Sequence, residues 1–183
     1  TGKKVVHDVL KAGDQWFDTG DLIREIDVGF AFGIRHFQFV DRTGDTFRWR
    51  SENVSTNEVA EVLNQHPQIH LSNVYGVEVP GCEGRAGMVA LAVDSPDTFD
   101  IAGFSRLVDT ELPVYARPLF IRLQASLKTT GTFKLVKTEL REQSFHLDQV
   151  GQDAIYVRPP KAESYQRLDE NFYQSLCSGT AGY

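Results

Sequence analysis

The feature that most constrains the fold is an alternation of two hydrophobic periods between residues 55 and 123. Segments with apolar residues at helical spacing, each begun by a capping residue, Ser55 or Asp100, alternate with short continuous apolar runs. Such runs, bounded by Gly and Pro, are typical of strands. The predicted order helix, strand, strand, helix, strand gives an α+β fold, with helices packed on one face of a small, mixed, mostly antiparallel sheet.

Local signals place the individual elements. Ser55-Thr56-Asn57-Glu58 is a capping box, and Val54 and Val59 form its hydrophobic staple, so a helix begins here and ends near His66-Pro67. A second helix begins at Asp100 and ends before Pro113. The expected strands cover residues 69–79, 87–93 and 119–123, and further helices are expected over 134–143 and 165–176. The polar stretch between these last two helices has no assignment.

Alternating aromatic residues predict a β-hairpin before the first helix. Phe37 and Phe39 share one face of the run 35–40, and Phe47 and Trp49 share one face of the run 46–50. The connector 41–45 contains two acids and a glycine, which favour a turn. We expect the two runs to pair with each other.

Composition excludes several classes of protein. The chain has 183 residues and a net charge of -6, from 19 Lys and Arg against 25 Asp and Glu, which disfavours a broad nucleic-acid-binding surface. No apolar run reaches the length of a membrane span. Cys82, Cys177 and the five histidines lack metal-ligand spacing, and two cysteines are too few for a disulfide framework. We therefore expect a reducing compartment and no metal site in this chain.

Two residues near the start of the chain are candidates for nucleotide binding. Asp21 follows a Thr-Gly turn, where its carboxylate can accept both hydroxyls of a ribose, although an Asp that merely caps such a turn is more common, by roughly three to one. Arg42 can bind ribose or phosphate oxygens, or stay solvated in its loop. Arg48 lies opposite Phe47 and Trp49, which is also the pattern of a solvent-facing charged edge.

A basic loop provides a third candidate. Lys128-Thr129-Thr130-Gly131-Thr132-Phe133-Lys134 combines hydroxyl, backbone and ammonium donors, which suit phosphate oxygens. The Gly-x4-Gly-Lys-Ser/Thr spacing of a P-loop is absent from the chain. A nucleotide site complete within this chain is therefore not expected.

Five ordered motifs resemble the C-terminal motifs of acyl-adenylate-forming enzymes. They are residues 16–21, 41–49, 52–54, 112–118 and 128–134. Gly44-Asp45-Thr46-Phe47-Arg48-Trp49, followed by Glu52-Asn53-Val54, resembles the branch of very-long-chain acyl-CoA synthetases and fatty acid transport proteins. The resemblance implies that residues 1–40 end the large N-terminal adenylation domain, 41–150 form a mobile C-terminal lid, and 151–183 form an extension with a helix.

The resemblance also implies roles in adenylation. Asp21 would hold the ribose hydroxyls of ATP, and Arg42 would contact ribose or phosphate. Lys134 matches the catalytic lysine that enters the site while the acyl-adenylate forms. Thr132-Phe133 between Gly131 and Lys134 is typical of the transport-protein branch.

Three further residues are implied in the second half-reaction. Asp41 would be the hinge about which the lid rotates, and the hairpin with Arg48 and Ser51 would then approach the acyl-adenylate and the CoA thiol. At Ser51 many members of the superfamily have glycine, and a side chain there can narrow the passage for CoA.

The function that the resemblance implies is that of the C-terminal portion of a fatty acid–CoA ligase, which forms an acyl-AMP from long or very long chain acids and ATP and transfers the acyl group to CoA. The portion alone is expected to be inactive. The alternatives are a ligase for another carboxylic acid, and a fatty acid transport or scaffolding role.

The implied partners are fatty acid, ATP, CoA and the protein's own N-terminal domain, which would hold most of the Mg²⁺ that accompanies ATP. No nucleic acid partner is expected. We expect an intracellular protein, and association with the endoplasmic reticulum, peroxisome or lipid droplet stays open. The last residues, Ala181-Gly182-Tyr183, are not a peroxisomal address of the Ser-Lys-Leu type.

Overall fold

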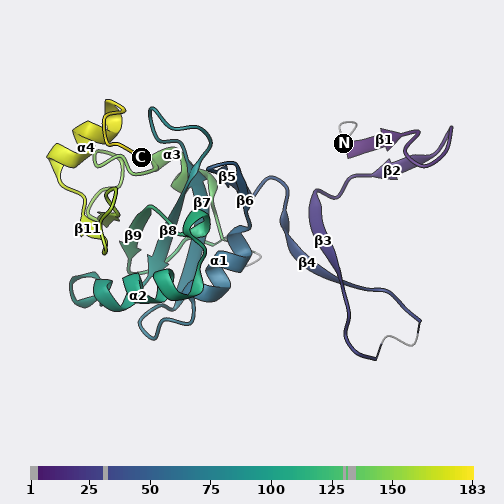
Figure 1. The fold of residues 1–183 in the computed structure, drawn as a ribbon, viewed down its shortest axis with the longest axis horizontal. Helices are drawn as coiled ribbons and strands as arrows, with labels where there is room; N and C mark the ends of the chain where they lie inside the picture. The colour runs from purple at the N-terminus through teal and green to yellow at the C-terminus, as the bar shows by residue number, and fades with distance from the viewer. Residues whose placement is uncertain (1–3, 31–32, 130, 132–134) are drawn as a thin grey trace. The chain divides into compact units, whose positions relative to one another are not determined.

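A computed structural model describes residues 4–30, 33–129, 131 and 135–183 of the chain (Figure 1). The chain divides into two compact units, Thr1–Asp45 and Thr46–Tyr183. Each unit has its own sheets, so each is described by itself.

The larger unit is built on a five-stranded sheet with the strand order β11-β10-β9-β8-β7. Neighbouring strands are antiparallel except for β8 and β9, which are parallel. The α+β class and the mixed, mostly antiparallel sheet are therefore confirmed. The strands are β7 (Leu71–Val77), β8 (Ala86–Ala92), β9 (Phe120–Gln124), β10 (Ala154–Val157) and β11 (Gln166–Arg167).

Helices α1 (Thr56–Leu63) and α2 (Ile101–Glu111) begin at the predicted caps. The Glu58 N–H donates to Ser55 Oγ at 3.3 Å, and the Gly103 N–H donates to Asp100 Oδ1 at 2.8 Å. Ser72 Oγ, on β7, donates to Ala60 O of α1, which places α1 on the face of the sheet shared by Ser72. The buried apolar residues of the two helices are Val59, Leu63, Phe104 and Val108.

The opposite face of the sheet is also covered, so the expectation that the helices pack on one face was wrong. Phe145, after α3 (Thr138–Gln143), stacks on Phe120 of β9 with 4.6 Å between ring centroids. All seven residues of β8 are buried. A continuous apolar run is the pattern of a strand covered on both faces, because alternate side chains point to opposite sides.

The C-terminal segment departs from the predicted helix over 165–176. Residues 166–167 form β11, and helix α4 (Glu170–Cys177) begins only at its cap Asp169, whose Oδ1 accepts the Phe172 N–H at 2.8 Å. Buried Tyr165 precedes the strand, and its hydroxyl donates to Pro118 O at 2.5 Å. Pairing with β10, a strand in the unassigned polar stretch, overrides the helical spacing.

The aromatic runs do not pair with each other as predicted. β4 (His36–Arg42) pairs with β3 (Asp21–Ile26), and β5 (Phe47–Trp49) pairs with β6 (Glu52–Val54). Alternation marks a strand but does not choose its partner, and the tight turn lies elsewhere. Arg50 and Ser51, with φ of 51° and 67°, form the two-residue turn between β5 and β6.

The smaller unit consists of two hairpins. β1 (Val5–His7) pairs with β2 (Gln15–Phe17), and β3 pairs with β4. Two short 3-10 helices of the larger unit, η2 (Pro96–Thr98) and η3 (Val114–Ala116), complete the elements. Within the described ranges, no helix is long and apolar enough to cross a membrane.

Candidate functional site

Asp21 and Arg42 occupy directly opposite positions on β3 and β4. Arg42 Nε lies 3.3 Å from Asp21 Oδ1, and the two side chains are 57% and 32% exposed. The preceding turn fixes this end of the hairpin, because the Asp21 N–H donates to Thr19 Oγ1 and the Thr43 N–H donates to Gly20 O. The structure thus brings the two predicted nucleotide-binding residues together and leaves both within reach of solvent.

Asp41, the predicted hinge, is buried, whereas Val40 before it on β4 is half-buried and Arg42 after it is exposed. Its Oδ1 accepts the Arg42 N–H at 2.8 Å. The division between the two compact units falls shortly after it, between Asp45 and Thr46. The hinge role itself stays a prediction.

Lys134, the predicted catalytic residue, lies outside the described residues, so its role stays a prediction. The chain on both sides of it is described. The Val136 N–H donates to Lys128 O at 3.1 Å, and Thr129 and Leu135 form an isolated antiparallel bridge. These contacts close the base of the loop that contains Lys134 in the sequence.

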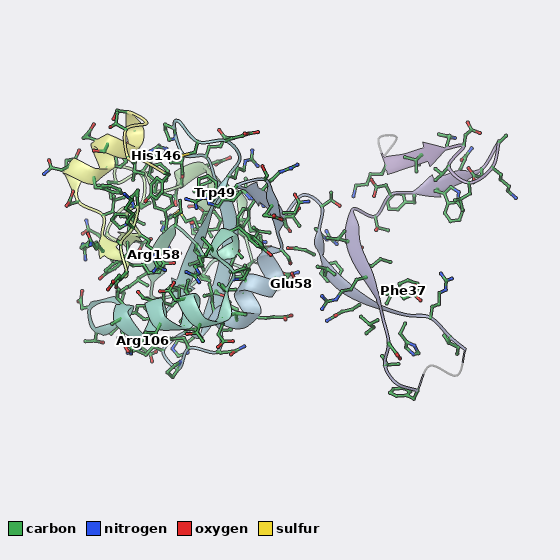
Figure 2. All side chains as sticks on the ribbon, in the orientation of Figure 1. Phe37, Trp49, Glu58, Arg106, His146 and Arg158 are labelled. Carbon is green, nitrogen blue, oxygen red and sulfur yellow. The ribbon has the colours of Figure 1, made fainter. Side chains whose placement is uncertain are left out.

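The β5–β6 hairpin exposes Arg48 and buries Phe47 and Trp49, as the alternation predicted, and it also exposes Ser51. The backbone of Arg48 is held by the β7–β8 connection, because the Arg85 N–H donates to Arg48 O at 2.7 Å. Figure 2 shows Trp49 within the body of its unit. Both side chains predicted for the thioester step therefore stand on a hairpin anchored to the main sheet.

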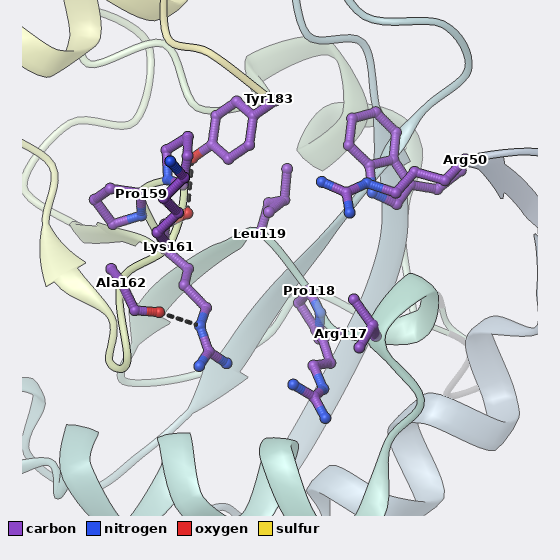
Figure 3. Close-up of a pocket in the computed structure, with 12 residues that line it drawn as sticks. Arg50, Arg117, Pro118, Leu119, Pro159, Lys161, Ala162 and Tyr183 are labelled. Carbon is purple, nitrogen blue, oxygen red and sulfur yellow. Dashed lines mark hydrogen bonds between the residues drawn. The ribbon is translucent and has the colours of Figure 1, made fainter.

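A pocket of about 240 Å³ beside this hairpin was missed by the sequence reasoning. Four cationic side chains line it, from the β5–β6 turn, the segment after η3 and the segment after β10 (Figure 3). These residues are Arg50, Arg117, Arg158 and Lys161. No local motif could reveal the pocket, because distant segments supply its cations and only the folded sheet brings them together.

Asp109 of α2 holds two of these arginines in place. Arg158 makes a bidentate pair with the Asp109 carboxylate, at 2.7 and 2.9 Å, and Arg117 Nη1 lies 2.7 Å from Asp109 Oδ1. The hydrogen bonds from Arg158 hold the pKa of the Asp109 carboxyl below its usual range. One carboxylate faces two guanidinium groups, so this cluster keeps a net positive charge.

The remaining contacts of Arg158 make its position rigid. Its Nε donates to Ala162 O at 3.1 Å, and its carbonyl oxygen accepts the Tyr183 hydroxyl at 2.8 Å (Figure 3). Arg50 lies over the Trp49 ring, with 5.9 Å from its guanidinium carbon to the ring centroid. The pocket is therefore a preorganised cationic surface that suits an anion. In the described part of the chain, no group of three His, Cys, Asp or Glu residues is placed to hold a metal ion.

Comparisons with known proteins show which proteins this chain resembles. No family model matches the chain. It is 43% identical over 180 residues to long-chain fatty acid transport protein 5 of Mus musculus, covering 98% of this chain and 25% of that protein. It is 42% identical over 179 residues to a very long-chain fatty acid transport protein of Cochliobolus heterostrophus, covering 96% and 27%. The chain thus spans about a quarter of the length of these relatives.

Solved structures agree. A fatty acyl CoA synthetase of Mycobacterium tuberculosis matches 70% of this chain and 24% of its own with a TM-score of 0.55 and 25% identity. The amide bond synthetase McbA of Marinactinospora thermotolerans matches 73% of this chain and 25% of its own with a TM-score of 0.59 and 28% identity. Over nearly its whole length this chain is related in sequence to the long-chain and very long-chain fatty acid transport proteins, and about 70% of it shares its fold with part of a solved fatty acyl CoA synthetase.

Proposed function

We propose that this chain is the C-terminal portion of a fatty acid–CoA ligase that activates long or very long chain acids with ATP and transfers the acyl group to CoA. The observation that carries the proposal is the solvent-accessible Asp21–Arg42 pair, in a chain related to fatty acid transport proteins over almost all of its length. These are the groups that the first half-reaction needs at the nucleotide.

The chemistry of the pair suits ATP. A carboxylate has two acceptor oxygens for the ribose hydroxyls, and a guanidinium donates to phosphate oxygens. In this proposal Asp21 orients the ribose and Arg42 contacts ribose or phosphate. Mg²⁺ would accompany the phosphates, held mainly by the part of the relatives' length that this chain does not span.

The cationic pocket suits the second substrate. CoA carries phosphate groups, and Arg50, Arg117 and Lys161 line a cavity beside the hairpin of Arg48 and Ser51. Preorganised cations bind phosphates without the cost of ordering them first. We propose that these side chains hold phosphates of CoA while its thiol attacks the acyl-adenylate.

The two half-reactions would use the chain in two orientations. Lys134 would approach the reacting carboxylate and α-phosphate during adenylation, where its ammonium group offsets the crowding of negative charge. Rotation about Asp41 would then withdraw Lys134 and bring the β5–β6 hairpin to the intermediate. The first orientation supplies Lys134 for adenylation, and the second supplies the β5–β6 hairpin for thioester formation.

The smaller unit supports the expectation that the rest of the polypeptide is needed. Its described residues expose several large apolar side chains, and clustered apolar surface is typical of a protein–protein interface. We propose that the N-terminal domain covers these residues, that the chain alone is inactive, that the protein is intracellular, and that any association with membranes comes from that domain.

The decisive experiment separates the half-reactions in the protein of the relatives' full length. Lys134→Ala should slow acyl-AMP formation about 100-fold or more, by analogy with the loss of one preorganised electrostatic donor, and leave thioester formation from presynthesised acyl-adenylate nearly unchanged. The matched control Lys161→Ala should show the opposite pattern. If Lys134→Ala slows both half-reactions equally and lowers the melting temperature, Lys134 has a structural role and the catalytic assignment is wrong.

Asp41→Pro tests the proposed rotation. Proline holds φ near about -65° and removes the backbone donor, so the variant should favour one orientation and impair one half-reaction more than the other. Wild-type rates in both steps would reduce Asp41 to a structural residue.

Two outcomes would favour the alternatives. If acyl-AMP forms only with carboxylic acids other than long-chain fatty acids, the ligase acts on a different substrate. If no acid tested is adenylated but fatty acid uptake into cells depends on the protein, a transport or scaffolding role replaces the ligase.

A further inference from the structure

The two chain segments that flank the loop between Thr129 and Leu135, here called its stems, are held by hydrogen bonds to three other elements. Besides the hydrogen bond from Val136 to Lys128 and the bridge from Thr129 to Leu135, three side-chain bonds reach the stems of the loop. They come from β7, from α3 and from the start of α1.

The first anchor is Asn73, which is buried in β7. Its Nδ2 donates to Val136 O at 3.2 Å, across 63 positions of sequence. Among the described residues, its Oδ1 has no hydrogen-bond partner. A buried, unpaired amide oxygen costs stability, so an apolar residue would serve the sheet better here. The hydrogen bond to Val136 O explains why an amide stands at this buried position, which packing within the sheet does not explain.

The second anchor is an ion pair supported from the core. Lys128 Nζ lies 2.7 Å from both carboxylate oxygens of Glu139, and these hydrogen bonds lower the pKa of the Glu139 carboxyl. Gln143 Nε2 donates to Glu139 Oε1 at 3.4 Å, and Gln143 Oε1 accepts a hydrogen bond from Arg122 Nη1 at 2.6 Å. Arg122 is buried in β9 and also pairs with Asp153. The first stem of the loop is thus connected to the sheet through a continuous polar network.

The third anchor lies just after the second stem. Lys137 Nζ donates at 2.8 Å to Thr56 Oγ1, the hydroxyl of the buried first residue of α1. The carbonyl of Val136 and the side chain of Lys137 are therefore bound to two different elements of the same domain. Together the three anchors determine the position and direction of both stems.

We propose that Asn73, Glu139 and Lys137 are positioning residues for adenylation, acting through the stems of the loop that contains Lys134. The inference rests on the proposed function. It follows from the cost of the arrangement, because a loop needed only as a connection would not require a buried amide, a core-supported ion pair and an interhelical bond at its base. Catalytic groups must be held to a fraction of an ångström, and misplacement by about 1 Å can cost about 100-fold in rate.

The test compares half-reactions in the protein of the relatives' full length. Asn73→Val removes the donor and its unpaired oxygen, and Glu139→Gln weakens the pair with Lys128 at a largely accessible site. Each should slow acyl-AMP formation about 10-fold, within the range of small displacements, and change thioester formation from presynthesised acyl-adenylate less than twofold. Amide exchange at Val136 should become faster in Glu139→Gln.

Matched controls remove similar groups that do not reach the loop. Ser72→Ala deletes a buried side-chain bond to a carbonyl from the adjacent position of β7, on the other face of the sheet. Glu142→Gln neutralises an acid on α3 and keeps the Lys128–Glu139 pair. Neither control should alter the ratio of the two half-reactions.

The outcomes separate this inference from the function on which it rests. Wild-type adenylation in both Asn73→Val and Glu139→Gln, with adenylation blocked by Lys134→Ala, overturns the positioning role and leaves the proposed function standing. Parallel loss of both half-reactions with a lower melting temperature in Glu139→Gln overturns it in favour of a structural role. An unaffected Lys134→Ala variant overturns both.

Discussion

Residues 4–45 and residues 46–183 contain the same kinds of aromatic and aliphatic side chains, but only the larger unit buries them. Eleven of the fourteen exposed large apolar residues described by the structure lie in the smaller unit. In Figure 2, Phe37 stands on an open two-stranded hairpin, and Trp49 is surrounded by side chains of its own unit. The eleven are Val6, Val9, Leu10, Trp16, Phe17, Leu22, Ile23, Phe30, Ile34, Phe37 and Phe39.

The difference has a simple physical cause. An isolated two-stranded hairpin has no second layer to cover its apolar face and is at best marginally stable in water. The larger unit covers both faces of a five-stranded sheet and therefore buries a continuous core. The candidate nucleotide residues Asp21 and Arg42 therefore stand on a unit that leaves most of its large apolar side chains exposed, whereas the cationic pocket stands on a unit with a buried core.

The largest expected contrast is between two phenylalanines. Phe104 is fully buried against Tyr165 and Phe99, whereas Phe37 is 53% exposed. Phe104→Ala should lower the free energy of unfolding of this chain by about 3–5 kcal/mol, and Phe37→Ala by less than about 0.5 kcal/mol. Urea denaturation followed by tryptophan fluorescence measures both. A comparable loss in the two variants would show that the smaller unit has a core of its own.

A smaller contrast concerns two ion pairs. Arg122 is almost fully buried; its Nε donates to Asp153 Oδ2 at 2.7 Å and its Nη2 lies 2.7 Å from the same oxygen, whereas the Asp21–Arg42 pair is largely exposed. Asp153→Ala leaves a buried guanidinium without its charge partner and should cost about 3 kcal/mol, against about 0.5 kcal/mol for Asp21→Ala. Denaturation midpoints in low and high salt check this, because only the exposed pair should be salt-sensitive.

The next contrast depends on pH. His66 is buried beside Phe99, and burial lowers its pKa below the ordinary value. The unfolded chain therefore binds more protons than the folded chain below about pH 6.5, and stability falls as the pH decreases, by at most about 1.4 kcal/mol per pH unit. His66→Gln should flatten this dependence, measured as the melting temperature between pH 7.5 and 5. The control His36→Gln, in the smaller unit, should keep it, and an unchanged slope in His66→Gln would remove His66 as the cause.

The smallest expected effect is a gain. Ser51 has φ of 67° in the β5–β6 turn, a conformation that favours glycine. Ser51→Gly should therefore stabilise the larger unit by about 0.5–1 kcal/mol, seen as a higher denaturation midpoint. The same variant tests the passage for CoA, since removal of the side chain should not slow thioester formation. Loss of stability would mean that the Ser51 side chain contributes a contact that outweighs the backbone strain.

Helix starts were predictable because the information is local. Ser55 and Asp100 cap their helices through bonds to residues three positions later, and such contacts are complete within one turn. Strand partners were not predictable from the sequence. The alternation in 35–40 and 46–50 shows which side chains share a face but does not determine which strands pair. The turn at Arg50 and Ser51 has no glycine to reveal it, which hid the β5–β6 hairpin.

The residues of the candidate site also fall into two groups, those that local sequence predicts and those that only the fold brings together. The ordered motifs in the sequence by themselves pointed to the family and to Asp21, Arg42 and Lys134, because each motif is a contiguous string whose residue types suit the chemistry. The tertiary structure decided that Asp21 and Arg42 are partners across two strands, and that Arg50, Arg117 and Lys161 line one pocket. Charges from distant segments become neighbours only when the core positions their backbones, and no local pattern encodes that distance.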